Sequence, residues 1–286
     1  MESVQVLTNL GFTNLEAEIY ISLLQQQHAT GYQVAKAIRK PTANVYKALL
    51  SLETKGAVFV EETEKKIFKA VSVSELLSQL NKQFQQHKNI AEETLNQLVT
   101  SQHDDKVYQL ATAAQTMERC RQMLAECQAI AVIDAFPTVL THLLPEIQNT
   151  IKRDVKVAIN LYRDMDIPGA RCCRRPDGDA IISRWPGEWI NIVIDGSEYC
   201  IALLTRDLRQ VIQAIWTESP YLSWVYYSAL MSELQLADLS QQIQDGASHT
   251  ELQKTLDEHN RFFPLDAPGY QKLTQRFEQL NIQENH

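Results

Sequence analysis

The stretch that decides the fold of the N-terminal region is GYQVAKAIRKPTANVYKALLSLETKG, residues 31–56. Apolar residues recur at spacings of three and four on both sides of Pro41, which predicts two helices. Proline disfavours helix at the residue before it and suits the first turn of a new one. We therefore expect a helix over 31–38, a sharp turn, and a second helix that runs to about Lys55 and ends at Gly56.

The residues around this stretch extend the pattern. An amphipathic run predicts a further helix over 14–27, with Asn14 as its N-cap. After the third helix come two strand-like stretches, 57–61 and 66–71, joined by the polar connector 62–65. Three helices followed by a β-hairpin is the order of a winged helix-turn-helix, which we expect in residues 1–71.

A winged helix of this kind places its second motif helix in the major groove of DNA. Asn44 offers the donor and acceptor pair that adenine presents, and the lysines suit phosphates. Tyr46 could equally be a packing residue. Any single lysine here, taken alone, is better explained as a solvated surface charge. We expect DNA contacts from the two motif helices, their turn and the wing: Tyr32, Gln33, Lys36, Arg39, Lys40, Thr42, Ala43, Asn44, Tyr46, Lys47, Lys65 and Lys66.

Charge is unevenly distributed along the 286 residues, whose net charge is −8. Residues 1–71 hold eight basic and seven acidic side chains, so they carry +1 and the rest carries −9. A nearly neutral domain with a local basic face still binds phosphates, but weakly. Binding would therefore depend on dimerisation or on contacts with bases.

Residues 73–99 predict a long amphipathic helix capped by Ser72 or Ser74. Its apolar positions alternate by three and four, in a seam that His87 and Thr94 weaken. The helix could pack on its own chain or pair with a second copy, and we favour the dimer. The seam consists of Leu77, Leu80, Phe84, His87, Ala91, Thr94 and Leu98.

The remaining chain predicts an α/β domain with a partly parallel sheet. Strands are expected at 106–110, 129–134, 155–161, 171–173, 180–185, 189–194 and 199–204, and helices at 112–127, 138–152, 207–217 and 221–244. Asp195-Gly196 is interpreted as a hairpin turn and nothing more. The domain boundaries that follow are 1–71 for the winged helix, 72–102 for the linker or dimerisation helix, 103–245 for the α/β domain, and 246–286 for a helical tail.

The segment RCCRR, residues 171–175, is the most unusual of the C-terminal half. Arginine matches carboxylate and phosphate with paired hydrogen bonds, so a small anionic effector could bind Arg171, Arg174, Arg175, Trp185 and Trp189. Two alternatives remain: an edge strand with exposed arginines and core tryptophans, which we favour, and an oxidant sensor at Cys172 or Cys173 with a lowered pKa.

Several function classes lack their motifs. The five cysteines are odd in number and form no C-x-x-C pair, so we expect neither a disulfide scaffold nor a zinc site. Glycine-rich phosphate loops, a G-x-S-x-G elbow and H-E-x-x-H are absent from the sequence. We therefore expect no catalytic residues, cofactor or metal. No apolar run suits a membrane helix or a signal peptide, which indicates the cytoplasm.

The N-terminal residues resemble the TrmB family of transcriptional regulators. The resemblance covers about residues 5–75 and rests on LGFT at 10–13, ATG at 29–31, VYKAL at 45–49 and LETKG at 52–56. It implies a winged helix that binds double-stranded DNA. The family often has an arginine near the start of the recognition helix, where this chain has Ala43-Asn44, so the family's target sites are not carried over.

More loosely, the C-terminal half resembles a phospholipase D-like domain, through AVIDAF at 131–136, KRDVKV at 152–157 and NIVIDG at 191–196. Catalysis in that superfamily needs His-x-Lys, and none of the seven histidines is followed by lysine two residues later. The resemblance implies the fold without that chemistry.

Together these patterns predict an α+β and α/β protein: an N-terminal winged helix-turn-helix, a long linker helix and a C-terminal α/β domain of phospholipase D-like fold. The expected function is a sequence-specific transcriptional regulator that acts as a homodimer and responds to a ligand or partner at the C-terminal domain. The alternatives are an enzyme whose winged helix is only an interaction module, and a DNA-architectural protein without an effector.

Overall fold

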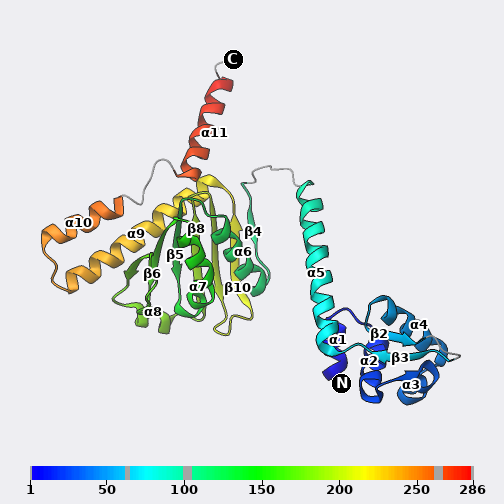
Figure 1. Ribbon diagram of the computed structural model, residues 1–286. Helices are drawn as coiled ribbons and strands as arrows, with labels where there is room; N and C mark the ends of the chain where they lie inside the picture. Colours follow the sequence, from blue (N-terminus) through cyan, green and yellow to red (C-terminus); the bar gives the residue numbers. More distant parts are fainter. Residues whose placement is uncertain (1, 62–64, 99–104, 261–266, 285–286) are drawn as a thin grey trace. The chain divides into compact units, whose positions relative to one another are not determined.

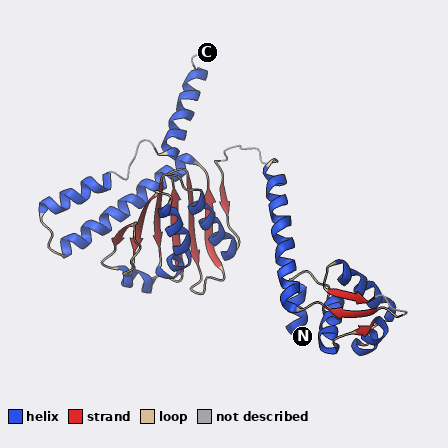
Figure 2. Cartoon of the chain, in the orientation of Figure 1, coloured by secondary structure: helices blue, strands red, loops and turns tan. Residues whose placement is uncertain are grey.

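The computed structural model describes residues 2–61, 65–98, 105–260 and 267–284 (Figure 1). The chain divides into two compact units, Met1–Ser101 and Gln102–His286. Figure 2 shows that the first is mostly helical and that the second is built around one large sheet. Among the described helices, none is both long enough and apolar enough to cross a membrane.

The N-terminal unit is a winged helix followed by a long helix. A small antiparallel sheet of order β1-β3-β2 packs with the helices. This confirms the expected fold. The elements are α1 (Glu2–Asn9), α2 (Asn14–Gln26), β1 (Ala29–Thr30), α3 (Gly31–Ile38), α4 (Thr42–Thr54), β2 (Val58–Glu61), β3 (Ile67–Ala70) and α5 (Val73–Asn96).

Helix starts in this unit are set by capping boxes. Thr13, not Asn14 as predicted, caps α2: its hydroxyl accepts from the Glu16 N–H at 3.2 Å, and the Glu16 carboxylate accepts from the Thr13 N–H at 2.7 Å. The prediction missed that Glu16 lies three residues after Thr13, the spacing of a capping box. Thr30 and Gln33 cap α3 in the same way.

Two short elements of this unit were not predicted. Helix α1 precedes the winged helix, and β1 lies in the expected break before α3, where it pairs with β3. A two-residue strand has no periodicity of its own, so only its pairing partner reveals it.

The N-terminal core is closed by the start of α5. Side chains of α2, α4 and β3 are almost fully buried together with Leu76 of α5. Beyond Leu80, most of the described α5 side chains are exposed, including Phe84 at 64% and Leu95 at 59%. Ser72 caps the helix by accepting from the Glu75 N–H at 3.3 Å.

The C-terminal unit contains a seven-stranded sheet of order β4-β10-β9-β8-β5-β6-β7. Strands β5, β6 and β7 are parallel and the other pairings are antiparallel, which agrees with the expected partly parallel sheet. Its elements are β4 (Val107–Gln109), α6 (Ala113–Glu126), β5 (Ile130–Ala135), α7 (Pro137–Lys152), β6 (Lys156–Leu161), β7 (Arg171–Arg174), α8 (Gly178–Arg184), β8 (Glu188–Ile194), β9 (Glu198–Leu204), β10 (Val211–Thr217), α9 (Pro220–Gln244), α10 (His249–Asn260) and α11 (Pro268–Glu284).

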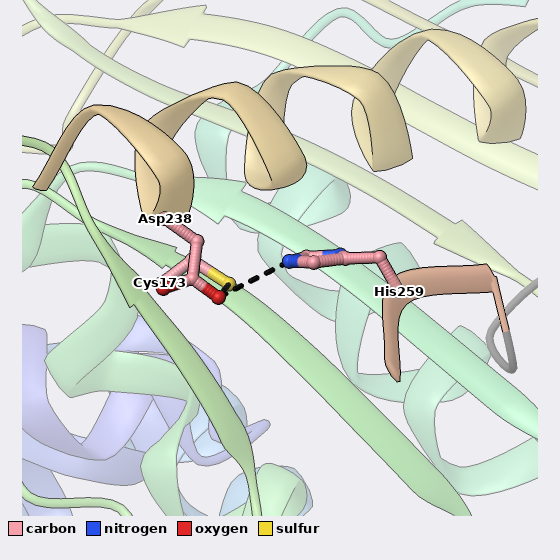
Figure 3. A group of neighbouring side chains, drawn as sticks. All are labelled: Cys173, Asp238 and His259. Carbon is pink, nitrogen blue, oxygen red and sulfur yellow. Dashed lines mark hydrogen bonds and ion pairs between the residues drawn. The ribbon is translucent and has the colours of Figure 1, made fainter. Parts of the chain in front are cut away.

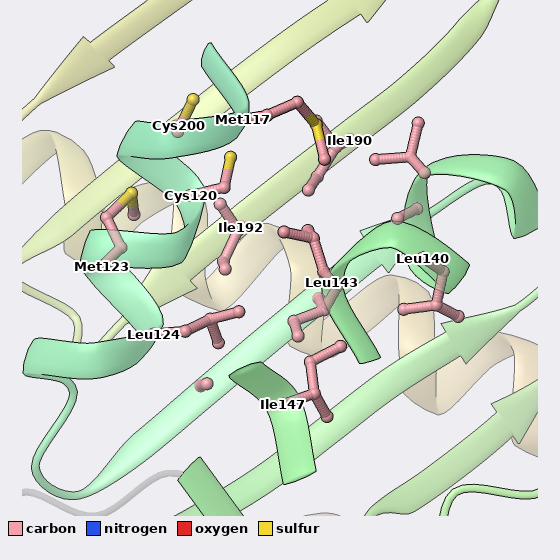
Figure 4. Close-up of a cluster of buried hydrophobic side chains, with 14 of the residues drawn as sticks. Met117, Cys120, Met123, Leu124, Leu140, Leu143, Ile147, Ile190, Ile192 and Cys200 are labelled. Carbon is pink, nitrogen blue, oxygen red and sulfur yellow. The ribbon is translucent and has the colours of Figure 1, made fainter. Parts of the chain in front are cut away.

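Helices cover both faces of this sheet, which explains why its central strands are apolar on both sides. On one face α6 and α7 pack against β8 and β9, and Figure 4 shows Met123, Leu143 and Ile192 among the buried side chains there. On the other face α9 packs through Tyr227 and Leu234.

Two predicted elements were wrong. Residues 180–185 form helix α8 instead of a strand, because two adjacent isoleucines give too short a run to distinguish the periods. Within the predicted helix 207–217, residues 211–217 instead form strand β10, which pairs with both β9 and β4. Val211, Ile212 and Ile215 are β-branched, and such residues favour a strand.

Asp195 does more than form the predicted turn. It has φ 53° and is followed by Gly196 with φ 61°, as a tight β8–β9 hairpin requires. Its carboxylate also accepts from the N–H groups of Gln128, Ala129 and Ile130 at 2.7–2.9 Å. The turn therefore fixes the start of β5 as well as joining β8 to β9.

Candidate nucleic-acid interface and ligand cleft

Helix α4 presents a polar N-terminal face to solvent. Thr42, Asn44 and Lys47 are exposed, as is Ala43, while Val45 is fully buried. Pro41 precedes the helix without any side-chain cap, so no side chain occupies the N–H groups of the first turn. A helix N-terminus without a side-chain cap favours phosphate oxygens, so a side chain able to pair with a base edge, Asn44, lies near a terminus of the kind that binds phosphate.

The basic residues of the motif differ in their surroundings. Lys36, Arg39 and Lys47 are exposed, and no ion pair is recorded for them within the described residues. Lys40 instead lies 3.2 Å from the Glu18 carboxylate. Arg39 ends α3 in a left-handed conformation, φ 57°, which makes the turn between the two helices tight. Of the four cations predicted in the two motif helices and their turn, three can therefore bind phosphates without first breaking an ion pair.

The two tyrosines of the motif have different environments. Tyr46 packs: its ring lies edge-on to Phe68 at 6.5 Å and so close to Gly31 that a Cβ there would sit 2.7 Å from it. Tyr32 is 63% exposed and is open to a DNA backbone. Gln33 is held by the capping box, where its side-chain oxygen accepts from the Thr30 N–H at 2.8 Å.

The wing is described on either side of its tip. Lys65 and Lys66 are exposed and directly precede β3. Residues 62–64 of the predicted connector lie outside the described residues. The predicted wing lysines are thus exposed at the start of β3, and their contact with DNA stays a prediction.

A buried ion pair fixes α4 on α2, and sequence reasoning missed it. The carboxylate of Glu16, 3% exposed, lies 2.7 Å from Lys55 Nζ and accepts from Ser51 Oγ at 2.6 Å. Burial opposes ionisation, but the Lys55, Ser51 and Thr13 hydrogen bonds outweigh it and lower the pKa of Glu16 to about 2. Because Ser51 lies on α4 and Lys55 at its C-terminal end, this network fixes the orientation of α4 on α2.

The five residues predicted to hold an effector do not lie at one place. Arg171 is bound to Asp238 at 2.8 Å and to Glu258 at 3.1 Å, and Arg174 to Asp164 at 3.0 Å. Only Arg175, Trp185 and Trp189 line a common cleft, of about 450 Å³. Arg171 and Arg175 both reach carboxylates of α9, but four residues apart along the chain, whereas Arg174 is paired with Asp164 instead.

Aromatic rings and buried polar groups form the cleft. Trp185 and Trp189 lie edge to face with centroids 4.6 Å apart, and both also line an adjoining hollow of about 390 Å³. Arg175 is bound to Glu233 at 2.9 Å. Within the described residues, the buried Nε1 of Trp189 has no hydrogen-bond partner. A ligand acceptor would satisfy it.

The floor of the cleft is Asp134, which sequence reasoning missed. Its carboxylate accepts from Asn160 at 3.0 Å, Tyr162 at 2.8 Å and Asn191 at 3.1 Å. Burial raises its pKa although these donors oppose the change. A charged residue within the apolar strand 129–134 was the available signal, since a carboxylate is rarely buried there without partners.

The thiols of Cys172 and Cys173 do not have the lowered pKa on which the oxidant-sensor alternative depends. Burial raises the pKa of Cys172, and it raises that of Cys173 to about 12. The prediction of a lowered pKa was wrong because Arg171 is engaged by carboxylates and Asp238 lies beside the Cys173 thiol.

Comparisons with known proteins support the N-terminal assignment. Residues 7–74 match the family described as "Sugar-specific transcriptional regulator TrmB". The "Uncharacterized protein YrhO" of Bacillus subtilis (strain 168) is 23% identical over 215 residues, which cover 75% of this chain and 78% of YrhO.

Similar solved structures include TrmBL2, described as an archaeal chromatin protein with a novel mode of DNA binding. It is 16% identical with a TM-score of 0.39, and the match covers 83% of this chain and 98% of TrmBL2. NucT from Helicobacter pylori is 10% identical with a TM-score of 0.37, covering 46% of this chain and 96% of NucT. A possible transcriptional regulator from Methanosarcina mazei Go1 is 15% identical with a TM-score of 0.28, covering 35% of this chain and 88% of that one.

The family match begins in α1 and ends in the first turn of α5, so it spans the whole winged helix. The quoted motifs from LGFT to LETKG fall inside it. Residues 7–74 of this chain are therefore similar to the TrmB family of transcriptional regulators.

Proposed function

We propose that this protein is a sequence-specific DNA-binding regulator that reads its operator with the N-terminal face of α4. The observation that carries the proposal is the arrangement of that face. Asn44 is exposed beside an uncapped helix N-terminus, and Lys36, Arg39 and Lys47 surround it without recorded ion pairs among the described residues. Asn44 would read a base, and the cations would bind phosphates.

Fluorescence anisotropy tests this function with DNA from upstream of the protein's own gene, against scrambled DNA, over a series of salt concentrations. Asn44→Ala should weaken binding to the preferred DNA by about 1–3 kcal/mol and binding to scrambled DNA little. Lys47→Ala should weaken both and lower the salt slope by about 1. Lys82→Ala on α5 removes the same charge outside this face and serves as the control.

Three other results separate the alternatives. Equal affinity for all DNA sequences, unaffected by Asn44→Ala, would favour an architectural protein. If the preferred DNA sequence occurs only elsewhere in the genome, the operator lies there and the proposed function still stands. Absence of binding at low salt would overturn the proposal and direct attention to the C-terminal cleft.

We also propose that two copies pair through α5. The support is the exposure of Phe84, Ile90 and Leu95 on this helix and of Leu98 just after its end, each at least 59% exposed. Phe84 and Leu98 belong to the predicted seam, and apolar side chains so exposed favour association. A dimer would place two α4 helices on two half-sites of an operator.

The effector of the C-terminal unit is proposed to be a small sugar that carries an acidic group. A cleft of about 450 Å³ lined by Trp185 and Trp189 is large enough for one sugar ring, and Arg175 suits the acidic group. The description of the matched family as sugar-specific supports the same class. Of the predicted effector residues, Arg171 and Arg174 lie outside this cleft.

A further inference from the structure

Cys173, Asp238 and His259 come from three different elements and meet inside the C-terminal unit. Figure 3 shows the Cys173 thiol on β7, the Asp238 carboxylate on α9 and the His259 ring on α10 facing one another. The cysteine and the histidine are each 1% exposed. Three side chains that are common metal ligands are therefore brought together by tertiary structure alone.

The ligand atoms have the spacing of a small metal site. His259 Nε2 lies 3.2 Å from Asp238 Oδ2, Cys173 Sγ lies 4.0 Å from the same oxygen, and the three atoms lie within 4.8 Å of one another. In tetrahedral zinc, bond lengths of about 2.0 Å to nitrogen or oxygen and about 2.3 Å to sulfur put the ligand atoms about 3.3–3.6 Å apart. To complete that geometry, the sulfur would have to approach Asp238 by about half an ångström and His259 by up to about 1 Å.

Outer contacts hold the carboxylate where a metal would need it. Asp238 Oδ2 accepts from Arg171 at 2.8 Å, and Oδ1 accepts from Gln242 Nε2 at 3.1 Å. Metal-binding carboxylates are usually hydrogen-bonded in this way. Gln242 is fixed in turn by Thr255 of α10, with 2.8 Å between Gln242 Nε2 and Thr255 Oγ1.

The local charges also balance with a divalent cation. Arg171 contributes one positive charge, and Asp238 and Glu258 contribute two negative ones. Binding of a divalent ion to the thiolate, with release of the Cys173 proton to water, adds one positive charge and brings the sum to zero. Lys254, 3.9 Å from Glu258, is 78% exposed, so its charge is largely screened by water.

We propose that Cys173, Asp238 and His259 form a binding site for one thiophilic divalent cation of the zinc type, with water as the fourth ligand. Sulfur, imidazole and carboxylate together select zinc or cobalt over magnesium or calcium, which prefer oxygen alone. The bound ion joins β7, α9 and α10, and so fixes α10 on the domain. The sequence analysis expected no metal because the three ligands are separated by 65 and 21 residues, outside any motif spacing.

The test uses the full chain without an affinity tag, first stripped with a chelator and then titrated with Co²⁺. The expected result is one cobalt per chain, with a near-ultraviolet thiolate-to-cobalt band and the intense visible bands of tetrahedral cobalt, both removed by Zn²⁺. Cys173→Ser should abolish the thiolate band, and His259→Asn should weaken binding by at least about tenfold.

Matched controls sit on the same elements. Cys172→Ser changes the adjacent, exposed cysteine on the opposite face of β7, and His249→Asn changes an exposed histidine at the start of α10. Both should bind cobalt as the unaltered chain does. A thiolate band that survives Cys173→Ser, or one that disappears with Cys172→Ser, would overturn the assignment.

The change of the thermal unfolding midpoint on adding Zn²⁺ is measured within each variant, so it tests the site even where a variant is less stable. Zn²⁺ should raise the unfolding midpoint of the unaltered chain and of both controls, because an ion that binds only the folded state stabilises it. At the same Zn²⁺ concentration it should raise the midpoint of His259→Asn less, because the weaker site stabilises the folded state less. No thiolate band and no zinc stabilisation in the unaltered chain would show that the cluster is only a hydrogen-bonded network.

Discussion

At the scale of single residues, the N-terminal unit depends on one buried carboxylate. Glu16 accepts hydrogen bonds from Thr13, Ser51 and Lys55 and is nearly inaccessible to water. Its local role, the capping box of α2, could be predicted from spacing alone. Its contact with Lys55, 39 residues later, could not, because the contact exists only once α2 and α4 pack.

Glu16→Gln should lower the free energy of unfolding at pH 7 by about 2–3 kcal/mol, because it leaves Lys55 without its carboxylate. The pKa is lowered on folding from 4.5 to about 2, so this stabilisation is complete above about pH 4.5 and is lost as the pH falls toward 2. Urea unfolding followed by circular dichroism at several pH values measures both effects.

Glu18→Gln is the control for this prediction, since Glu18 forms an ion pair with Lys40 in which both side chains are at least 32% exposed. Exposed pairs of this kind contribute at most about 1 kcal/mol. Equal stability of the two variants across the pH range would show that the Glu16 network does not stabilise the fold.

At the scale of elements, strongly periodic helices were predicted well and short runs were not. The expected helices 31–38 and 221–244 agree with α3 and α9 to within a residue. The segment of β10 was predicted to be a helix and that of α8 a strand. Neighbouring elements, and not the local sequence, decide the secondary structure of each. Strand β10 satisfies its backbone by pairing with β9 and β4, partners that its own sequence does not show.

The exposed seam of α5 carries a prediction at this scale. Phe84→Glu should convert a dimer to a monomer in sedimentation velocity, because a charge in an apolar seam is not solvated. Asn89→Glu places the same charge elsewhere on the same helix and should leave the dimer intact. A monomer at all concentrations for the unaltered chain would contradict the pairing.

At the scale of the whole molecule, a regulator needs its ligand cleft to be coupled to DNA binding. Glucose 6-phosphate is a suitable probe because it combines a ring for the tryptophans with an anion for Arg175. We expect it to change the intrinsic tryptophan fluorescence and the affinity of the chain for DNA. The affinity for DNA rises if the ligand-bound state binds DNA better than the free state, and falls if it binds DNA less well. Glucose and inorganic phosphate should each bind more weakly, because each lacks one of the two contacts.

Arg175→Gln should reduce the affinity for glucose 6-phosphate by at least about tenfold and leave the weak binding of glucose unchanged. Arg174→Gln is the matched control, since Arg174 is the adjacent arginine and is paired with Asp164 outside the cleft. Similar affinities in the two variants would mean that the anion is not bound by Arg175.

The sequence by itself determined the winged helix, the long helix after it and the α/β class of the second unit, because these depend on local periodicity and turn chemistry. It also located the polar face of α4, since buried and exposed positions alternate along one helix. Tertiary structure alone decided that Arg175 is the arginine that lines the cleft with the tryptophans, and it brought Asp134 to Tyr162 and Cys173 to His259. Such groups are distant in the chain, and only strand order and helix packing bring them together.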